Sequence, residues 1–209
     1  RSYEWSPDGT RMLLIVQDPS PADLDQVPRA NPRPYVIDRL QFKQDYVGYL
    51  DDRRTHVYVI GIADRSVRQV TFGDYDDSQA TWSPDGRHIV FVSNRTDQPD
   101  MNRNTDLWRV DVTCEQSSPE QLTTAPYADS SPVFSPDGRH IAYTSSVSAG
   151  LPVYAIPQLA ILDVVTGSSR LVESLAEIQA LNIRYAAGGR SILAITEFRG
   201  EQQLVRVDL

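Results

Sequence analysis

Two apolar runs in this chain have the same length and the same neighbours, His88–Ser93 and His140–Ser145. Both are rich in β-branched and aromatic side chains, which is typical of strands. Each run follows a Ser-Pro-Asp-Gly sequence, and a shorter strand pattern ending on Trp82 or Phe134 comes before that sequence. The pattern therefore predicts a β-hairpin at the start of each unit.

The hairpin sequence recurs along the chain. The Ser-Pro-Asp-Gly turn follows Trp5, Trp82 and Phe134, and a degenerate Ala-Ala-Gly-Gly turn follows Tyr185. The step is 52 residues from Trp82 to Phe134 and 51 residues from Phe134 to Tyr185, which indicates repeated structural units. Proline presets φ, aspartate bonds its own backbone and glycine accepts a positive φ. This turn chemistry predicts structural roles for Asp85, Gly86, Asp137 and Gly138.

Each unit continues with a third strand pattern, at residues 106–112 and 159–164, and with a short fourth one, at residues 120–123 and 170–172. Four short antiparallel strands at a step of about 50 residues are typical of β-propeller blades. No segment has a sustained helical period. The sequence predicts an all-β fold, a partial β-propeller of about three and a half blades with four antiparallel strands each.

The first unit is longer than the others. Trp5 and Trp82 are 77 residues apart, 25 more than the regular step, and the excess lies at residues 18–54. Prolines in this insertion withhold backbone donors from a ladder, and residues 35–42 are predicted to add an extended segment over the blade. We expect one domain, residues 1–209, with blades at about residues 1–73, 74–125, 126–176 and, incomplete, 177–209.

The last unit has no fourth strand pattern. An open array of blades leaves strand edges exposed at both ends. The remaining blades are therefore expected elsewhere in a longer polypeptide or in another copy, and the isolated piece is expected to self-associate through its edges.

One aromatic residue stands at a fixed place in every unit: Trp5, Trp82, Phe134 and Tyr185. Such rings could stack on a ligand, but a twisted sheet also needs one large side chain to fill the wedge between neighbouring blades. Because the rings recur with the repeat, we assign them to packing.

The composition argues against nucleic acid and membranes as partners. Twenty basic and 28 acidic side chains give a net charge of -8, opposite to the basic surface that nucleic acid or an anionic membrane requires. No apolar stretch approaches the 18 residues of a membrane span. The single cysteine, Cys114, excludes an intrachain disulfide and favours a reducing compartment, so a cytoplasmic location is predicted. A lost signal peptide, and with it export, stays open.

Catalytic chemistry is missing from the sequence. There is no Gly-x-Ser-x-Gly nucleophile elbow. His88 and His140 occupy the same place in consecutive units, so both are predicted to be structural, and His56 is predicted to be a surface histidine without an assignable partner. The chain alone is therefore not expected to be an enzyme.

Metal and cofactor signals are equally weak. Cys114 has no companion ligand at zinc spacing. The aspartates Asp74, Asp76 and Asp77 do not match a twelve-residue calcium loop, and Asp77 recurs as Asp129. The repeated aspartate is predicted to cap a turn or to bond neighbouring backbone. No phosphate-binding glycine loop is present, so no metal and no cofactor are expected.

The repeated Trp-Ser-Pro-Asp-Gly turn followed by Ile-Val-Phe-Val-Ser resembles the blades of TolB-like proteins and of peptidases of the prolyl oligopeptidase family. Two further stretches are similar to the propeller of acylaminoacyl-peptidase-type members of that family. They run from residue 35 to residue 56 and from residue 93 to residue 108. The similarity covers residues 1–145 best.

In that family a propeller precedes an α/β-hydrolase domain that holds the catalytic serine, aspartate and histidine, and it admits only short peptides to the active site. The resemblance therefore implies a non-catalytic gate whose partners are the hydrolase domain of the parent chain and short peptides. No catalytic residue can be transferred to this chain. Tyr49, Arg53 and Arg54 are candidate substrate contacts, because an arginine can bind a peptide carboxylate through two hydrogen bonds.

Two other functions stay open. A TolB-like propeller would bind a protein partner through its rim loops or channel and carry no enzyme, and a signal peptide would precede it. A fragment that folds alone as a small scaffold is the third alternative, and the exposed blade edges argue against it.

Overall fold

The computed structural model describes residues 3–19, 36–37, 39–50, 52–115, 117–146, 156–175 and 178–209. In these residues the fold is all-β, as predicted, and helix is limited to two single 3-10 turns, η1 (Pro99–Met101) and η2 (Glu173–Leu175). Neither turn has the length or the hydropathy that a membrane crossing needs.

Four antiparallel sheets follow one another along the chain. The first sheet contains β1 (Tyr3–Trp5), β2 (Arg11–Gln17), β5 (Thr55–Gly61) and β6 (Val67–Gln69). The second contains β7 (Asp77–Trp82), β8 (His88–Ser93), β9 (Asp106–Asp111) and β10 (Glu120–Gln121). The third contains β11 (Asp129–Phe134), β12 (His140–Ser145), β13 (Gln158–Asp163) and β14 (Ser169–Leu171). The fourth contains β15 (Ala180–Tyr185), β16 (Ser191–Phe198) and β17 (Glu201–Asp208).

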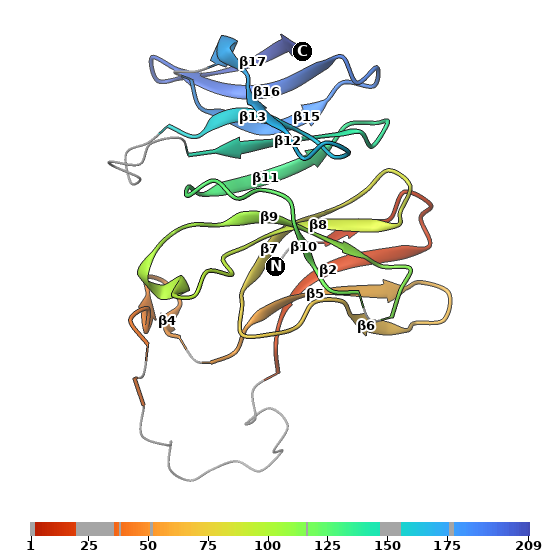
Figure 1. The fold of residues 1–209 in the computed structure, drawn as a ribbon, viewed down its shortest axis with the longest axis vertical. Coiled ribbons are helices and arrows are strands. Elements are labelled where there is room, and N and C mark those ends of the chain that lie inside the picture. Colours follow the sequence, from red (N-terminus) through yellow and green to blue (C-terminus); the bar gives the residue numbers. More distant parts are fainter. Residues whose placement is uncertain are drawn as a thin grey trace.

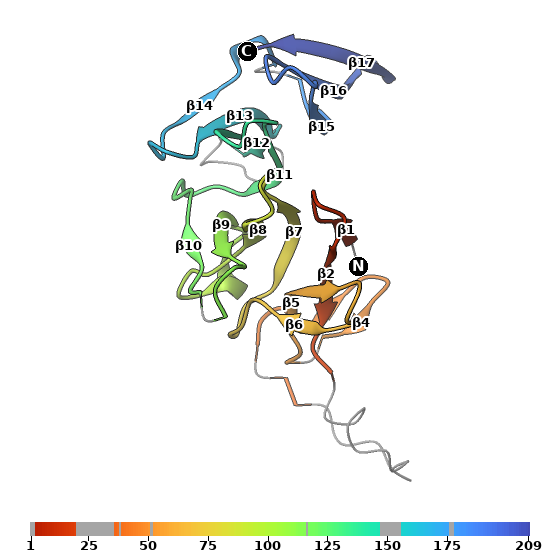
Figure 2. The same ribbon diagram turned by 90° about the vertical axis from the view of Figure 1, so that its right-hand side faces the viewer.

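The sheets are stacked face to face (Figure 1). Turned by a quarter, they form an arc in which the first strands β1, β7, β11 and β15 lie on the inner side and β6, β10 and β14 lie on the outer side (Figure 2). The tight turns between first and second strands gather at one edge of the stack, and most of the longer connections gather at the opposite edge (Figure 1). This is the arrangement of propeller blades around part of a circle.

The insertion in the first sheet differs from its prediction. The extended segment expected over the blade at residues 35–42 is not a strand where it is described, and Tyr35 and Asp38 lie outside the described residues, as do residues 20–35. Instead a small hairpin forms from β3 (Lys43–Gln44) and β4 (Gly48–Tyr49). Its short turn includes Tyr46, which has a positive φ of 64°.

The repeated turns share one hydrogen-bond pattern. The Ser83 hydroxyl donates to Asp85 Oδ1 at 2.5 Å and accepts the His88 amide at 2.9 Å. Gly86 takes a φ of 67°, which costs glycine little because it lacks a Cβ. The same bonds recur around Ser6 and Ser135. The predicted turn therefore has a physical basis, a hydroxyl that closes the turn from inside.

The fourth turn lacks this hydroxyl, because Ala186 stands where the other turns have serine. We expect the triple change Ala186→Ser, Ala187→Pro and Gly188→Asp to raise the free energy of unfolding by about 1–2 kcal/mol, through new hydrogen bonds and a stiffer unfolded chain. Urea denaturation measures the change. The opposite change in the second turn, Ser83→Ala, should cost about 1 kcal/mol. A triple variant less stable than the wild type would contradict the role of the hydroxyl.

Apolar side chains fill the space between neighbouring sheets. Three clusters lie there, one for each pair of sheets, around Phe91, Leu107 and Ile192. Trp82 is 3% exposed in the first cluster, and Phe134 and Tyr185 pack against the other two. Trp5 is 50% exposed, since no described sheet covers its ring. The rings of Trp82, Phe134 and Tyr185 therefore pack between their own sheet and the sheet before it.

Candidate functional site

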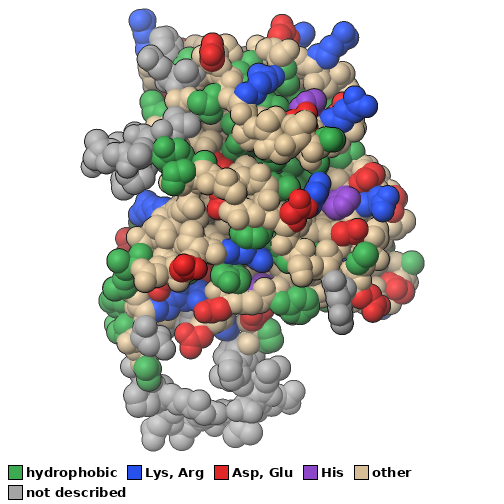
Figure 3. Space-filling model, in the orientation of Figure 1, with side chains coloured by type: hydrophobic (Ala, Val, Ile, Leu, Met, Phe, Trp, Pro, Cys, Tyr) green, Lys and Arg blue, Asp and Glu red, His purple; other side chains and the backbone are tan. Residues whose placement is uncertain are grey.

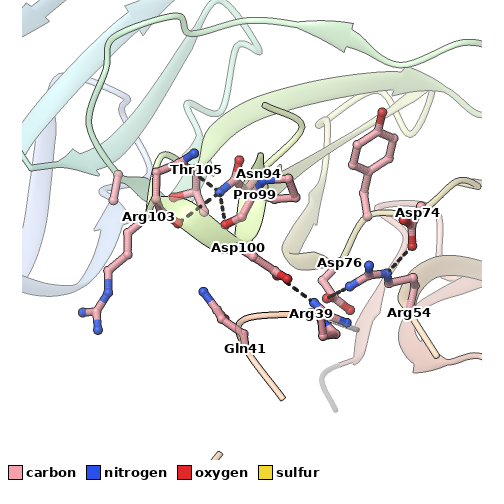
Figure 4. Close-up of a pocket in the computed structure, with 13 residues that line it drawn as sticks. Arg39, Gln41, Arg54, Asp74, Asp76, Asn94, Pro99, Asp100, Arg103 and Thr105 are labelled. Atoms are coloured by element: carbon pink, nitrogen blue, oxygen red, sulfur yellow. Dashed lines mark hydrogen bonds and ion pairs between the residues drawn. The ribbon is translucent and has the colours of Figure 1, made fainter. Parts of the chain in front are cut away.

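A cavity of about 390 Å³ opens at the edge that carries the long connections. Side chains from the insertion, from the β6–β7 and β8–β9 connections and from the loop before β11 line it (Figure 4). It therefore lies where the first, second and third sheets meet. Charged groups of both signs surround it.

Arg54 fixes one side of this cavity. Its Nε lies 2.7 Å from Asp74 Oδ1 and its Nη1 lies 3.3 Å from Asp76 Oδ2 (Figure 4). The second oxygen of Asp76 accepts the Thr55 amide at 2.9 Å. The hydrogen bond from Arg54 lowers the pKa of Asp74. The guanidinium thus joins the end of the insertion to the β6–β7 loop, whose carboxylates it engages.

Arg39 fixes the opposite side. Its Nη2 lies 3.0 Å from Asp100 Oδ1 in η1, which ties the insertion to the β8–β9 connection. That connection is braced internally, because the Asn94 side chain donates to Asn102 Oδ1 at 2.9 Å. Arg103 is exposed and forms no ion pair with a described residue. Of the three arginines that line the cavity, Arg103 is therefore the one whose charge is open to a ligand.

One of the three predicted substrate contacts lines the cavity. Arg54 lines the cavity, but Tyr49 and Arg53 do not. Tyr49 is exposed on β4, where its ring stacks on Phe42 with centroids 6.3 Å apart. Arg53 is half-buried. Whether any of the three contacts a peptide stays a prediction.

The predictions for His56 and Asp77 are both wrong. It is not a surface histidine, because only 2% of it is exposed. Its Nδ1 lies 3.5 Å from Asp77 Oδ2 and its Nε2 lies 3.4 Å from Asp18 Oδ2. Asp77 does not cap a turn with its side chain, since its other carboxylate oxygen accepts Arg95 Nη2 at 3.1 Å. The aspartate at the start of β7 points into the contact between two sheets, where only charged and polar partners can satisfy it.

Arg95 completes this buried network. Its guanidinium lies over the rings of Tyr75, Phe91 and Trp108, with its central carbon 4.9 to 5.2 Å from the ring centroids. Cation–π contacts of this kind are strongest when the cation is desolvated. The sequence analysis did not predict the ion pair between Arg95 and Asp77. The register of the β7–β8 hairpin, which sets Asp77 opposite Ser93, is the signal that places Arg95 near Asp77.

A second groove, of about 660 Å³, runs along the inner strands β1, β7, β11 and β15. Three of these strands bulge at the same place in the repeat, and the bulge residues Gln79, Ser131 and Asn182 have φ values of 48°, 56° and 49°. The side chain of Gln79 accepts the Ser131 amide at 2.5 Å, which links neighbouring sheets. The groove is polar, so it is suited to hydrogen bonding with an extended ligand.

Glu4 links the first two sheets in this groove. Its carboxylate accepts the Thr81 hydroxyl at 3.1 Å and the Trp82 amide at 3.3 Å. Burial raises its pKa. Across the described ranges, no three histidine, cysteine, aspartate or glutamate side chains gather as metal ligands would.

Two curated proteins are similar in sequence to part of this chain. No family model matches the chain. The uncharacterized peptidase YuxL of Bacillus subtilis is 26% identical over 107 residues, which cover 50% of this chain and 16% of that protein. The uncharacterized protein Atu1656 of Agrobacterium fabrum is 33% identical over 94 residues, which cover 45% of this chain and 29% of that protein. The chain therefore spans less than a third of either relative.

Solved structures decide the fold. An acylaminoacyl peptidase of Pyrococcus horikoshii superposes with a TM-score of 0.67 at 17% identity, over 99% of this chain and 30% of that one. TolB of Acinetobacter baumannii superposes with a TM-score of 0.59 at 18% identity, over 98% of this chain and 39% of that one. The chain is a β-propeller segment. The segment resembles the propeller regions of acylaminoacyl peptidases and TolB-like propellers alike, as its sequence predicts.

A third structure limits what these similarities mean. The putative TolB of Agrobacterium tumefaciens superposes with a TM-score of 0.63 at 16% identity, and the propeller segment covers 57% of it. At these identities the superpositions establish the fold alone. The function has to be argued from the site.

Proposed function

We propose that this propeller segment is the non-catalytic part of a serine-type peptidase of the acylaminoacyl or oligopeptidase kind, and that it gates the access of short peptides to a separate α/β-hydrolase domain. The observation that carries the proposal is the insertion, which two arginine ion pairs fix beside the 390 Å³ cavity. The sequence similarity to a protein described as a peptidase supports it. A cytoplasmic location belongs to the same proposal.

The hairpin of the insertion supports a hydrolase domain as the partner. Apolar side chains gather at this corner of the molecule (Figure 3), and those exposed in and just before the hairpin are Val36, Ile37, Leu40, Phe42, Tyr46, Val47 and Tyr49. Contiguous exposed apolar surface is uncommon on isolated proteins and marks interaction sites. Since Arg39 and Gln41, just before the hairpin, line the cavity, a domain packed on the hairpin and on this segment would also cover the cavity.

The electrostatics of the cavity suit the end of a peptide. Arg54 and Arg39 are already paired with aspartates, so their part in the proposal is to position the insertion. Arg103 offers a guanidinium, which binds a carboxylate through two charge-assisted hydrogen bonds. The free C-terminus of a short peptide has the matching chemistry.

The first test uses the full-length protein that contains this segment. We expect it to hydrolyse short blocked peptides and to be labelled by a serine-directed fluorophosphonate, and we expect the 209-residue segment to do neither. Peptides of about 30 residues should be cleaved far more slowly than tripeptides, because a gate excludes them. An unlabelled, inert full-length protein would overturn the proposal and favour a binding propeller.

A second test addresses the cavity. In the full-length protein we expect Arg103→Ala to raise KM roughly tenfold for peptides with a free C-terminus, since a charge-assisted hydrogen bond contributes about 1.5–3 kcal/mol. KM for the same peptides with an amidated C-terminus should not change. Arg206→Ala, in an exposed ion pair on β17, is the matched control. Equal effects on both peptide series would contradict carboxylate binding by Arg103.

The alternative is a TolB-like protein-binding propeller without enzymatic activity. The groove along the inner strands favours it, because a mostly polar lining suits hydrogen bonding with an extended partner. The fluorophosphonate experiment separates the two functions.

A further inference from the structure

Two buried aspartates occupy equivalent places in neighbouring sheets. Asp77 begins β7 and Asp129 begins β11, and neither has any exposed surface. Each lies in the contact with the preceding sheet. The two contacts are therefore equivalent in the repeat.

The third strand of the preceding sheet provides the comparison. In the first sheet the Val57 amide bonds the Thr71 hydroxyl at 2.9 Å, and in the second sheet the Leu107 amide bonds the Thr123 hydroxyl at 3.0 Å. The residue just before this bond is His56 in the first sheet and Asp106 in the second. A histidine thus faces Asp77, and an aspartate takes the same place beside Asp129.

The first contact is neutralised. Arg95 Nη2 lies 3.1 Å from Asp77 Oδ1, while Asp77 Oδ2 lies 3.5 Å from His56 Nδ1 and forms no hydrogen bond with a described residue. A fixed cation at this distance offsets much of the cost of burying a carboxylate.

In the part of the chain that the structure describes, the second contact has no such cation. Asp106 is 2% exposed and accepts the Gln121 side-chain amide at 3.0 Å and the Thr123 hydroxyl at 3.4 Å. Both carboxylate oxygens of Asp129 are buried, and the neighbours that favour its charged form are only the hydroxyls of Ser145 and Thr123, whose effect on the pKa is smaller than that of burial. The sequence has Val147 at the place, 52 residues on, where Arg95 stands in the repeat.

The groups packed around the pair are neutral. From the strand and loop after β9 they are Gln121 and Thr123, and from β12 they are Ser145 and the Tyr143 phenol. No described arginine, lysine or histidine forms an ion pair with Asp106 or Asp129. Two carboxylates that share a buried site cannot both ionise without a large electrostatic cost.

We propose that Asp106 and Asp129 form a carboxyl pair that holds one proton between the second and third blades, and that the contact between these blades loosens when the proton is lost. The pair is the counterpart of the Arg95–Asp77–His56 network one blade earlier.

The direction of the pH dependence follows from the protonation states. Burial, and then the charge of Asp129, raises the pKa of Asp106 from 3.8 to about 6, and burial also raises the pKa of Asp129. The folded state therefore keeps protons that the unfolded chain has lost. Since the unfolded state binds fewer protons, stability falls as the pH rises from about 4 through about 6. The two carboxyls titrate as a coupled pair.

Hydrogen exchange of amides in β9 and β11, read by mass spectrometry in the full-length protein, tests this locally. At pH 8 we expect Asp129→Asn to raise the protection of these amides at least about tenfold, because the substitution removes a buried charge. At pH 4.5 the same variant should stay within about twofold of the wild type, where the carboxyl is already protonated. Lower protection in the variant at pH 8 would overturn the proposal.

Asp77→Asn is the matched control. It leaves Arg95 and His56 without their carboxylate, so it should lower the protection of amides in β5 and β7 about tenfold or more at pH 8. Opposite signs at equivalent positions would not arise from a general effect of replacing a buried aspartate. Two effects of the same sign would contradict the difference between the two contacts.

Two further measurements separate a proton from a cation. Infrared difference spectra between the wild type and Asp106→Asn at pH 5 should show the band of a protonated carboxylic acid. Addition of calcium and then of a chelator at pH 8 should leave the protection of β9 and β11 unchanged. Calcium-dependent protection in the wild type that Asp129→Asn abolishes would mean that a metal ion, and not a proton, neutralises the pair.

Discussion

Replacing Arg95 with methionine is expected to lower the free energy of unfolding by about 3–5 kcal/mol, the largest loss that we expect from a single polar side chain in this propeller segment. The substitution keeps most of the apolar volume but leaves Asp77 buried without its guanidinium. The contacts of the cation with the rings of Tyr75 and Trp108 are lost as well. Urea denaturation followed by tryptophan fluorescence measures the loss.

Arg109→Met is the matched control for this prediction. Arg109 pairs with Glu120 at 2.6 Å, but that pair is partly exposed, so its loss should cost at most about 1 kcal/mol. The double variant Asp77→Asn, Arg95→Met should lose less than the sum of the two single variants, because neither partner is left alone. Additive losses would mean that the two side chains stabilise the fold independently.

Trp82→Ala is expected to cost about 3–5 kcal/mol, since it empties a large volume between the first and second sheets. Its indole also donates to the Glu4 carbonyl at 3.4 Å, and the Arg11 guanidinium lies 4.8 Å above its ring. Thermal unfolding of the 209-residue segment measures the effect. The repeat provides its own control in Trp5→Ala, which should cost about 1 kcal/mol or less because half of that side chain is in solvent. Similar losses from both tryptophans would contradict the assignment of Trp82 to the space between the sheets.

The hairpins were predictable from the sequence because their signals are local. Ser83, Asp85 and Gly86 lie within four positions of one another, and the side-chain bonds of Ser83 and Asp85 stay inside the turn. The strands on either side then follow from the same short stretch. The 52-residue step from Trp82 to Phe134 also predicts where the next unit begins.

The buried charges were not predictable in the same way. His56 and Asp77 are 21 positions apart and meet only because the first two sheets stack. The sequence therefore predicts a surface position for His56, and it predicts that Asp77 caps a turn or bonds neighbouring backbone. The candidate contacts Tyr49 and Arg53 depend on the path of the insertion, which no repeat constrains.

The tight turns lie on one rim of the segment and most long connections lie on the other. The two rims therefore differ in how much sequence change they tolerate. The first three tight turns use their serine and aspartate side chains for their own hydrogen bonds, so that rim has little freedom to vary. Connections on the other rim leave from strand ends and can lengthen at a small entropic cost, as the first sheet illustrates. The two-residue link between β16 and β17, Arg199 and Gly200, belongs to the same rim by strand order. A new recognition loop grafted there would add a binding surface on the same rim as the cavity. The contacts between blades would stay intact.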